Sequence, residues 1–172
     1  FFLIVAGAAV TSNQAGLSVP DWPLSYGKVM PEMKDGVFYE HGHRMVATTV
    51  GFLTVVLAIW IQIRDPRAWM RKLGWAAVGF VIAQGVLGGL TVLFLLPKEI
   101  SIAHACMAQL FFCTTVAIAV FQSKGWAQGP EIVEDSHRPS QEAIAKVVPF
   151  FVIAQLLLGA AFRHNATGLV PH

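Results

Sequence analysis

The stretch that decides the fold is Glu40-His41-Gly42-His43-Arg44-Met45-Val46-Ala47. It places charged and titratable side chains at the start of an apolar run that continues without a charge over residues 45–63. Polar groups at the end of a membrane helix are costly, so they are read as functional by default. Glu40 and His43 are three residues apart, and they share one face if the helix begins by Glu40. The stretch therefore predicts a membrane helix with a functional site at one end.

A second histidine, His104, opens the apolar run 101–122 in the same way. Two imidazoles near the starts of two membrane helices can face each other across a bundle and hold a flat, apolar cofactor. Heme is the first candidate, because a pair of axial histidines is a standard way to hold its iron. Gln84 and Gln109 are polar side chains inside apolar runs, and we expect them to hydrogen-bond across helices.

The composition is that of a membrane protein. The 172 residues are 55% hydrophobic and only 13% charged, whereas about a quarter of the residues in a soluble domain are charged. We therefore expect an all-α polytopic membrane protein. The formal charge of +2 forms no basic stripe, so nucleic acid is not expected as a partner.

There is no signal-peptide pattern, and the first apolar run is shorter than the ~20 residues of a full span. We therefore expect the natural N-terminus to lie upstream of Phe1.

Length and charge predict one partial and four complete membrane-spanning runs. Within the second complete run, Gly85 and Gly89 have the spacing of small residues that allows close helix approach, or close approach beside a cofactor. The predicted runs are 1–11, 42–63, 73–95, 101–122 and 144–162.

The charges of the short loops predict the orientation. The loop 64–72 holds four cations, whereas the turn around Lys98 holds only that lysine, balanced by the acid that follows it. The positive-inside rule therefore places 64–72 in the cytoplasm. His43, His104 and His164 then all lie near the non-cytoplasmic surface.

An internal repeat relates the two ends of the chain. The segment 7–17 aligns with 159–169 at a constant offset, and six of the eleven positions are identical. The repeat predicts a duplicated four-helix unit in parallel orientation, because an even number of helices returns the chain to the same side. The expected parts are an N-terminal four-helix transmembrane bundle (1–122), a cytoplasmic linker (123–143) and the first helix of a second, truncated repeat (144–172).

Three features together resemble the heme A synthase family. They are Gly16-Leu17-Ser18-Val19-Pro20-Asp21-Trp22-Pro23-Leu24, the segment 40–44, and His104 at the opening of the fourth helix. That family is built from two similar four-helix bundles in one membrane chain. The resemblance covers essentially the whole chain, as an N-terminal half plus the first helix of the second half. It implies oxidation of a methyl group of heme O to a formyl group, which gives heme A for terminal oxidases.

The resemblance also implies roles for single residues. His43 and His104 match the N-terminal pair of axial ligands to heme iron, and Glu40 matches a carboxylate considered important for the chemistry. Arg44 is expected to bind a heme propionate or to pair with Glu40, because a buried cation needs a partner. The implied cofactor is heme, as heme b, heme O or heme A. His164 aligns with no ligand of the first repeat.

One departure from the family concerns thiols. Some members carry two cysteines around the Pro-Asp-Trp-Pro segment, and here those places hold Ser18 and Ser25, so no thiol or disulfide can act there. The segment around Trp22 is either a rigid lid over the site or an interfacial anchor. His41, two residues from His43, points elsewhere and is expected in a solvated loop.

Other functions stay open at this point. The leading alternative is a membrane b-type cytochrome that only transfers electrons, and a heme-binding subunit without catalysis is another. A non-heme di-iron site is disfavoured, because it needs about four carboxylates inside the bundle and no Asp or Glu occurs within a predicted run. The expected partners are a heme substrate and membrane lipid, with heme O synthase, an electron acceptor or a second copy of the chain as further candidates. The expected location is the prokaryotic plasma membrane or the mitochondrial inner membrane.

Overall fold

The computed structural model describes residues 1–129 and 138–166. It has two compact units, Phe1–Ile118 and Ala119–His172. Over the described residues there is no β-strand, only an isolated bridge between Ser25 and Lys28. The helices are α1 (Phe2–Ser12), α2 (Asp35–Arg64), α3 (Ala68–Leu93), α4 (Lys98–Phe121), α5 (Lys124–Gln128) and α6 (Gln141–Ala166).

Four of these helices are long and apolar enough to cross a membrane. They are α2, α3, α4 and the part Gln141–Gly159 of α6, while α1 is apolar but shorter. Many of their apolar side chains face outward, such as Phe52 and Ile63, which are 67% and 73% exposed. Such a surface suits lipid, in which a helix satisfies its own backbone hydrogen bonds. The prediction of an all-α polytopic membrane protein with four complete spanning runs is confirmed.

Several boundaries differ from those predicted, and the start of α2 differs most. Helix α2 begins at Asp35 rather than at residue 42, because the polar residues ahead of the apolar run are also helical and an acid in the first turn favours a helix start. The whole segment 40–44 is therefore helical. The predicted linker 123–143 contains the short helix α5, whose start is capped by the Ser123 hydroxyl accepting a hydrogen bond from the N–H of Trp126.

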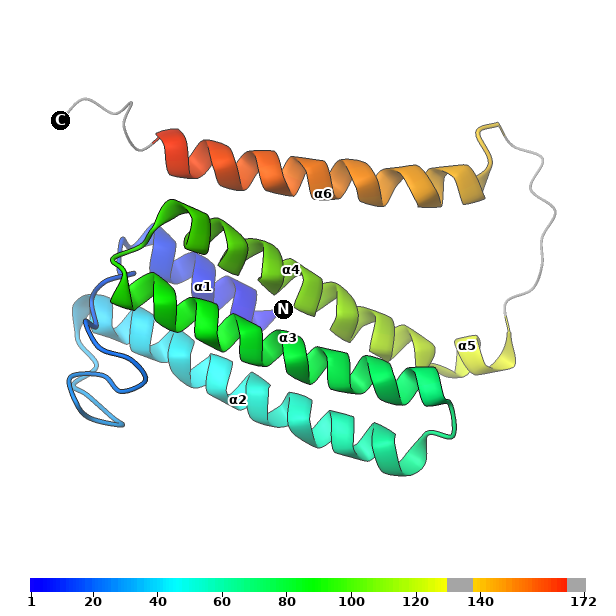
Figure 1. Ribbon diagram of the computed structural model, residues 1–172, viewed down its shortest axis with the longest axis horizontal. Helices are drawn as coiled ribbons and strands as arrows, with labels where there is room; N and C mark the ends of the chain where they lie inside the picture. The colour runs from blue at the N-terminus through cyan, green and yellow to red at the C-terminus, as the bar shows by residue number, and fades with distance from the viewer. Residues whose placement is uncertain (130–137, 167–172) are drawn as a thin grey trace. The chain divides into compact units, whose positions relative to one another are not determined.

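In the first unit, α2 packs closely against α3 and α1 (Figure 1). Small residues allow the α2–α3 approach, since a β-carbon on Gly74 would lie 3.5 Å from the Cα atom of Ala58. The expected close helix approach at Gly85 and Gly89 is not found. A β-carbon on Gly85 would meet nothing within 4 Å, and Gly89 receives a loop side chain instead.

One end of the first unit gathers the polar segments. The α1–α2 loop (residues 13–34) lies there, where α2 and α4 begin and α1 and α3 end (Figure 1). His43 and His104, each near the start of its helix, are at this same end. The side chain of His164 and the residues 167–169 of the repeat lie outside the described part of the chain. The duplicated four-helix unit and the three-part division of the chain stay predictions.

Candidate functional site

His43 lies in α2, and its imidazole packs against α1. A β-carbon on Gly7 would lie 3.1 Å from the Cε1 atom of His43, which is tighter than ordinary van der Waals contact, so a glycine gives this ring its room. The Nδ1 atom of His43 is buried and has no hydrogen-bond partner. Buried polar atoms are nearly always paired, so an unpaired one calls for an explanation.

His104 lies in α4, and its ring packs against α3 as the ring of His43 packs against α1. A β-carbon on Gly88 would lie 3.2 Å from the Cε1 atom of His104. Gln84 of α3 lies with its Nε2 atom 3.3 Å from Nε2 of His104, which confirms the expected cross-helix bond of Gln84. Because an amide nitrogen only donates, the ring accepts at Nε2 and carries its proton on Nδ1, which is buried without a partner.

The two rings lie near each other. His43 and His104 lie close enough for the charge of one ring to act on the other, although the close packing partners of α2 are α3 and α1. Each ring is backed by a glycine of a neighbouring helix, and each has a buried nitrogen that no protein group satisfies. Two imidazoles from different helices in a largely apolar bundle are the donor set of a bis-histidine heme, so these residues fit that group.

Glu40 and Arg44 form a buried ion pair beside His43 on α2. The Oε1 atom of Glu40 accepts a hydrogen bond from Nη2 of Arg44 at 2.6 Å, and the two side chains are only 5% and 16% exposed. The other oxygen, Oε2, accepts from the backbone N–H of Val19 at 2.9 Å. Of the two partners expected for Arg44, the structure shows Glu40.

Arg44 also holds the α1–α2 loop over the bundle. Its Nη1 atom donates to the backbone carbonyls of Asp21 at 2.8 Å and Leu24 at 2.9 Å. Its Nη2 atom approaches the carbonyl of Val19 at 3.4 Å. A guanidinium has five donors in a rigid fork, which is why an arginine can tie three backbone carbonyls and a carboxylate together.

The loop is closed by a hydrogen-bonded turn of its own. The carboxylate of Asp21 accepts from the N–H groups of Gly27 at 2.8 Å and Tyr26 at 2.7 Å, and these bonds, that of Gly27 foremost, hold the pKa of Asp21 below its usual value. Ser25 and Lys28 exchange both backbone hydrogen bonds at 3.0 Å. Tyr26 and Gly27 between them have φ values of 54° and 68°, which is the type I′ geometry of a tight hairpin.

Trp22 connects this loop to α3. A β-carbon on Gly89 would lie 2.7 Å from the Cδ2 and Cε2 atoms of the Trp22 indole, so the ring rests directly on the helix backbone. Gly88, the neighbouring residue, backs His104. The indole and the His104 ring therefore occupy adjacent positions on α3, and the contact favours the lid over the mere interfacial anchor.

A larger residue at position 89 is expected to lift this lid. In Gly89→Val the indole of Trp22 must leave α3, and overpacking of this kind costs ~1–3 kcal/mol. Trypsin cleavage after Lys28, which follows the population of the open loop, should then become about tenfold faster. The control is Gly85→Val on the same helix, where a β-carbon meets nothing within 4 Å. Equal cleavage rates in the two variants would contradict the lid.

His41 is buried rather than solvated, which corrects the prediction for it. It is 6% exposed, and its Nδ1 atom lies 2.8 Å from the hydroxyl oxygen of Ser25. The reason is the early start of α2, which puts His41 on the helix and under the loop. Ser25, one of the two serines that stand where some family members have cysteine, is 1% exposed. In this protein the hydroxyl of Ser25 forms a hydrogen bond with His41.

Comparison with known proteins identifies the family of the chain. The model of a family described as cytochrome oxidase assembly protein matches residues 1–171. The chain belongs to the cytochrome oxidase assembly protein family. The match covers both described units, and the similar members of this family carry the name heme A synthase, which confirms the resemblance drawn from the segments 16–24 and 40–44.

Three members of the cytochrome oxidase assembly protein family illustrate the similarity. The heme A synthase of Shouchella clausii is 32% identical over 172 residues, which cover 96% of this chain and 56% of that protein. The corresponding values are 29% over 175 residues, 97% and 57% for Alkalihalophilus pseudofirmus, and 27% over 166 residues, 94% and 54% for Symbiobacterium thermophilum. The chain thus spans about half the length of the curated relatives it matches. No solved structure matches it.

Proposed function

We propose that the protein acts as a heme A synthase, oxidising a methyl group of heme O to a formyl group. The observation that carries the proposal is that the rings of His43 in α2 and His104 in α4 lie near each other, each packed against a glycine of a neighbouring helix. The relatives named heme A synthase, which match nearly the whole chain, support the same activity.

In this proposal His43 and His104 would hold the heme iron, and the group would be heme b, heme O or heme A. When bound, the porphyrin supplies both the iron and the methyl carbon that is oxidised. Gly7 and Gly88 keep the two rings close to the helix backbones, and Gln84 gives up its long hydrogen bond so that Nε2 of His104 is free to bind.

Glu40 is the proposed catalytic carboxylate. It lies three residues before His43 on α2 and so on the same face, where it stabilises positive charge at the reacting carbon or takes a proton. Both of its oxygens already accept hydrogen bonds, from Arg44 and from the N–H of Val19. A proton taken at Oε2 displaces that N–H, so the carboxylate and the loop move together.

The α1–α2 loop and Arg44 have a positioning role at the same site. Arg44 balances the charge of Glu40 in the resting state and holds the backbone around Trp22, which keeps water from this end of the bundle. We further propose that this end faces the non-cytoplasmic side of a bacterial plasma membrane. Heme O synthase as the source of the substrate, an electron acceptor and a second copy of the chain are the proposed partners.

The test is formyl-heme production in cells that make heme O and contain no other heme A synthase. We expect the pyridine extract of membranes to contain formyl heme when the protein is expressed, and none in the same cells with an empty vector. A protein that carries heme while its cells never form formyl heme would contradict the enzyme and favour the rival function, a b-type cytochrome that only transfers electrons.

A further inference from the structure

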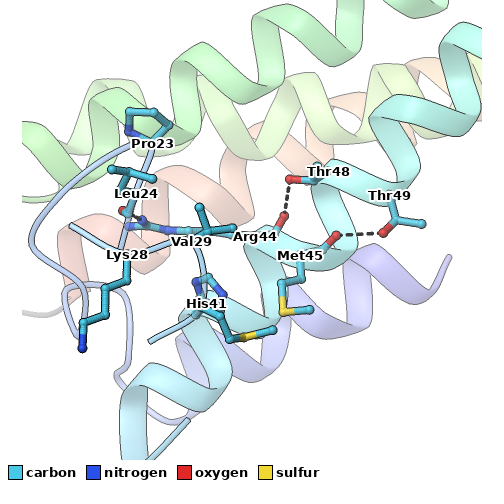
Figure 2. A pocket seen from close by; sticks show the side chains of 10 residues that line it. Pro23, Leu24, Lys28, Val29, His41, Arg44, Met45, Thr48 and Thr49 are labelled. Carbon is cyan, nitrogen blue, oxygen red and sulfur yellow. Dashed lines mark hydrogen bonds between the residues drawn. The ribbon is translucent and has the colours of Figure 1, made fainter. Parts of the chain in front are cut away.

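A cavity lies between the α1–α2 loop and helix α2 (Figure 2). Its volume is about 360 Å³, within the range of small-molecule sites. Neither His43 nor His104 lines it. We call it the loop cavity. Its walls come from the loop, with Leu24, Lys28 and Met30, and from one face of α2, with His41, Arg44 and Met45.

The polar wall of the loop cavity offers hydrogen-bond donors. His41 is 6% exposed, and its Nε2 atom is buried without a partner. The hydroxyl oxygen of Ser25 lies 2.8 Å from Nδ1 of His41 and 3.5 Å from Nη1 of Arg44. Because a guanidinium only donates, Ser25 accepts from Arg44, and its own hydrogen is available for Nδ1 of His41; this is the tautomer that we take here. The neutral ring of His41 then carries its proton on Nε2, a donor that the protein does not use.

The charge in the loop cavity is positive. Lys28 has no acidic partner among the residues that the structure describes, and no carboxylate lines the cavity. Thr48 and Thr49 also line it, but their hydroxyls donate to the backbone carbonyls of Arg44 and Met45. The charge of Arg44 is offset by its carboxylate partner on α2. A matching ligand accepts hydrogen bonds and carries negative charge.

Helix α2 extends the loop cavity by an apolar stripe. Beyond Met45 and Thr49, the residues Phe52, Val56 and Ile59 follow at helical spacing on the same face. They are 67%, 44% and 45% exposed. They lead from the polar end of the helix into the charge-free run, the direction in which a lipid chain lies. A soluble anion would gain nothing from this stripe.

We propose that the loop cavity binds an anionic phospholipid. Its phosphodiester accepts hydrogen bonds from Nε2 of His41 and from the ammonium of Lys28, and an acyl chain lies along Phe52, Val56 and Ile59. Because His41 is bonded to Ser25 and Lys28 lies in the same turn, the lipid ties the α1–α2 loop to the bilayer. This site is independent of heme and goes beyond the proposed function.

The test is native mass spectrometry of the detergent-purified protein, offered phosphatidylglycerol or phosphatidylcholine with the same acyl chains. We expect a retained phosphatidylglycerol adduct and a weaker one with phosphatidylcholine, whose cationic head finds no acid in the cavity. Lys28→Gln should weaken phosphatidylglycerol binding about fivefold, the effect of one cation near a lipid surface. Lys72→Gln, at the opposite end of the bundle, is the matched control and should change nothing.

Lys28→Gln is the deciding variant, because its side chain is exposed and the loop does not depend on it. His41→Phe, which removes the buried donor, should weaken binding further. Equal binding in Lys28→Gln and Lys72→Gln would overturn the proposal. Displacement of phosphatidylglycerol by inorganic phosphate would instead assign the cavity to a soluble anion, and displacement by a short-chain quinone to a neutral ligand; either result would also overturn it.

Discussion

Replacing His43 by alanine is expected to abolish the low-spin heme signal of the protein. The ring of His43 packs against Gly7 and has a buried nitrogen without a protein partner. With His104 alone, the protein would lack the pair of histidines that gives a low-spin heme. The measurement is the reduced-minus-oxidised absorbance spectrum of the detergent-purified protein.

Two controls separate ligation from loss of structure. In His43→Gly, added imidazole should restore the low-spin signal, because the space left beside Gly7 has the shape of the missing ring. His41→Ala, two residues along the same helix but directed to Ser25 and not to Gly7, should keep the heme signal. An unchanged spectrum in His43→Ala would rule His43 out as an axial ligand.

Replacing Glu40 by alanine is expected both to release the α1–α2 loop and to end formyl production. The variant leaves the guanidinium of Arg44, only 16% exposed, without its carboxylate and the N–H of Val19 without its acceptor. Breaking one side of a buried ion pair costs ~3–5 kcal/mol. The release is measured by trypsin cleavage after Lys28 and by the temperature of thermal unfolding in detergent.

Glu40→Gln separates the two roles of Glu40. The amide oxygen can still accept from Val19 or from Arg44, though not from both, so the loop should open less than in Glu40→Ala and the protein should still bind heme. The charge and the basic oxygen are lost, so formyl heme should fall to background. Normal formyl production in Glu40→Gln would show that Glu40 only anchors the loop. In the double variant Glu40→Gln with Arg44→Met, the stability loss should be smaller than the sum of the single losses, since no unpaired charge remains.

The membrane helices and the histidine pair could be predicted from the sequence, because their signals are local. A charge-free run of about 20 residues needs no partner to be recognised as a span. A histidine at the start of such a run stands out because polar groups there are costly. The start of α2 was missed by the same logic, since the helical residues before Gly42 are polar and leave no hydropathy signal.

The residues that shape the site could not be found in this way. Gly7 and Gly88 back the two rings, yet a glycine in an apolar helix looks the same whether it meets a ring, a helix or nothing, as Gly85 shows. The repeat aligns Gly7 with Gly159, and this recurrence was the sequence signal that could have pointed to a role for Gly7. The burial of His41 was not predicted for a related reason. Its partner Ser25 lies in a loop, and a loop has no periodic sequence pattern from which its path could be predicted.

The sequence by itself determined that this chain is an all-α membrane protein of the cytochrome oxidase assembly family, with His43 and His104 at the same end of its helices. These properties depend on hydropathy, charge and short motifs, each of which lies within one segment. Only the tertiary structure decided that Arg44 joins Glu40 to the loop, that Trp22 rests on Gly89, and that a cavity lies between the loop and α2. Those contacts join residues far apart in the chain. They depend on the turn geometry of the loop and on the positions at which a glycine leaves space for an aromatic ring.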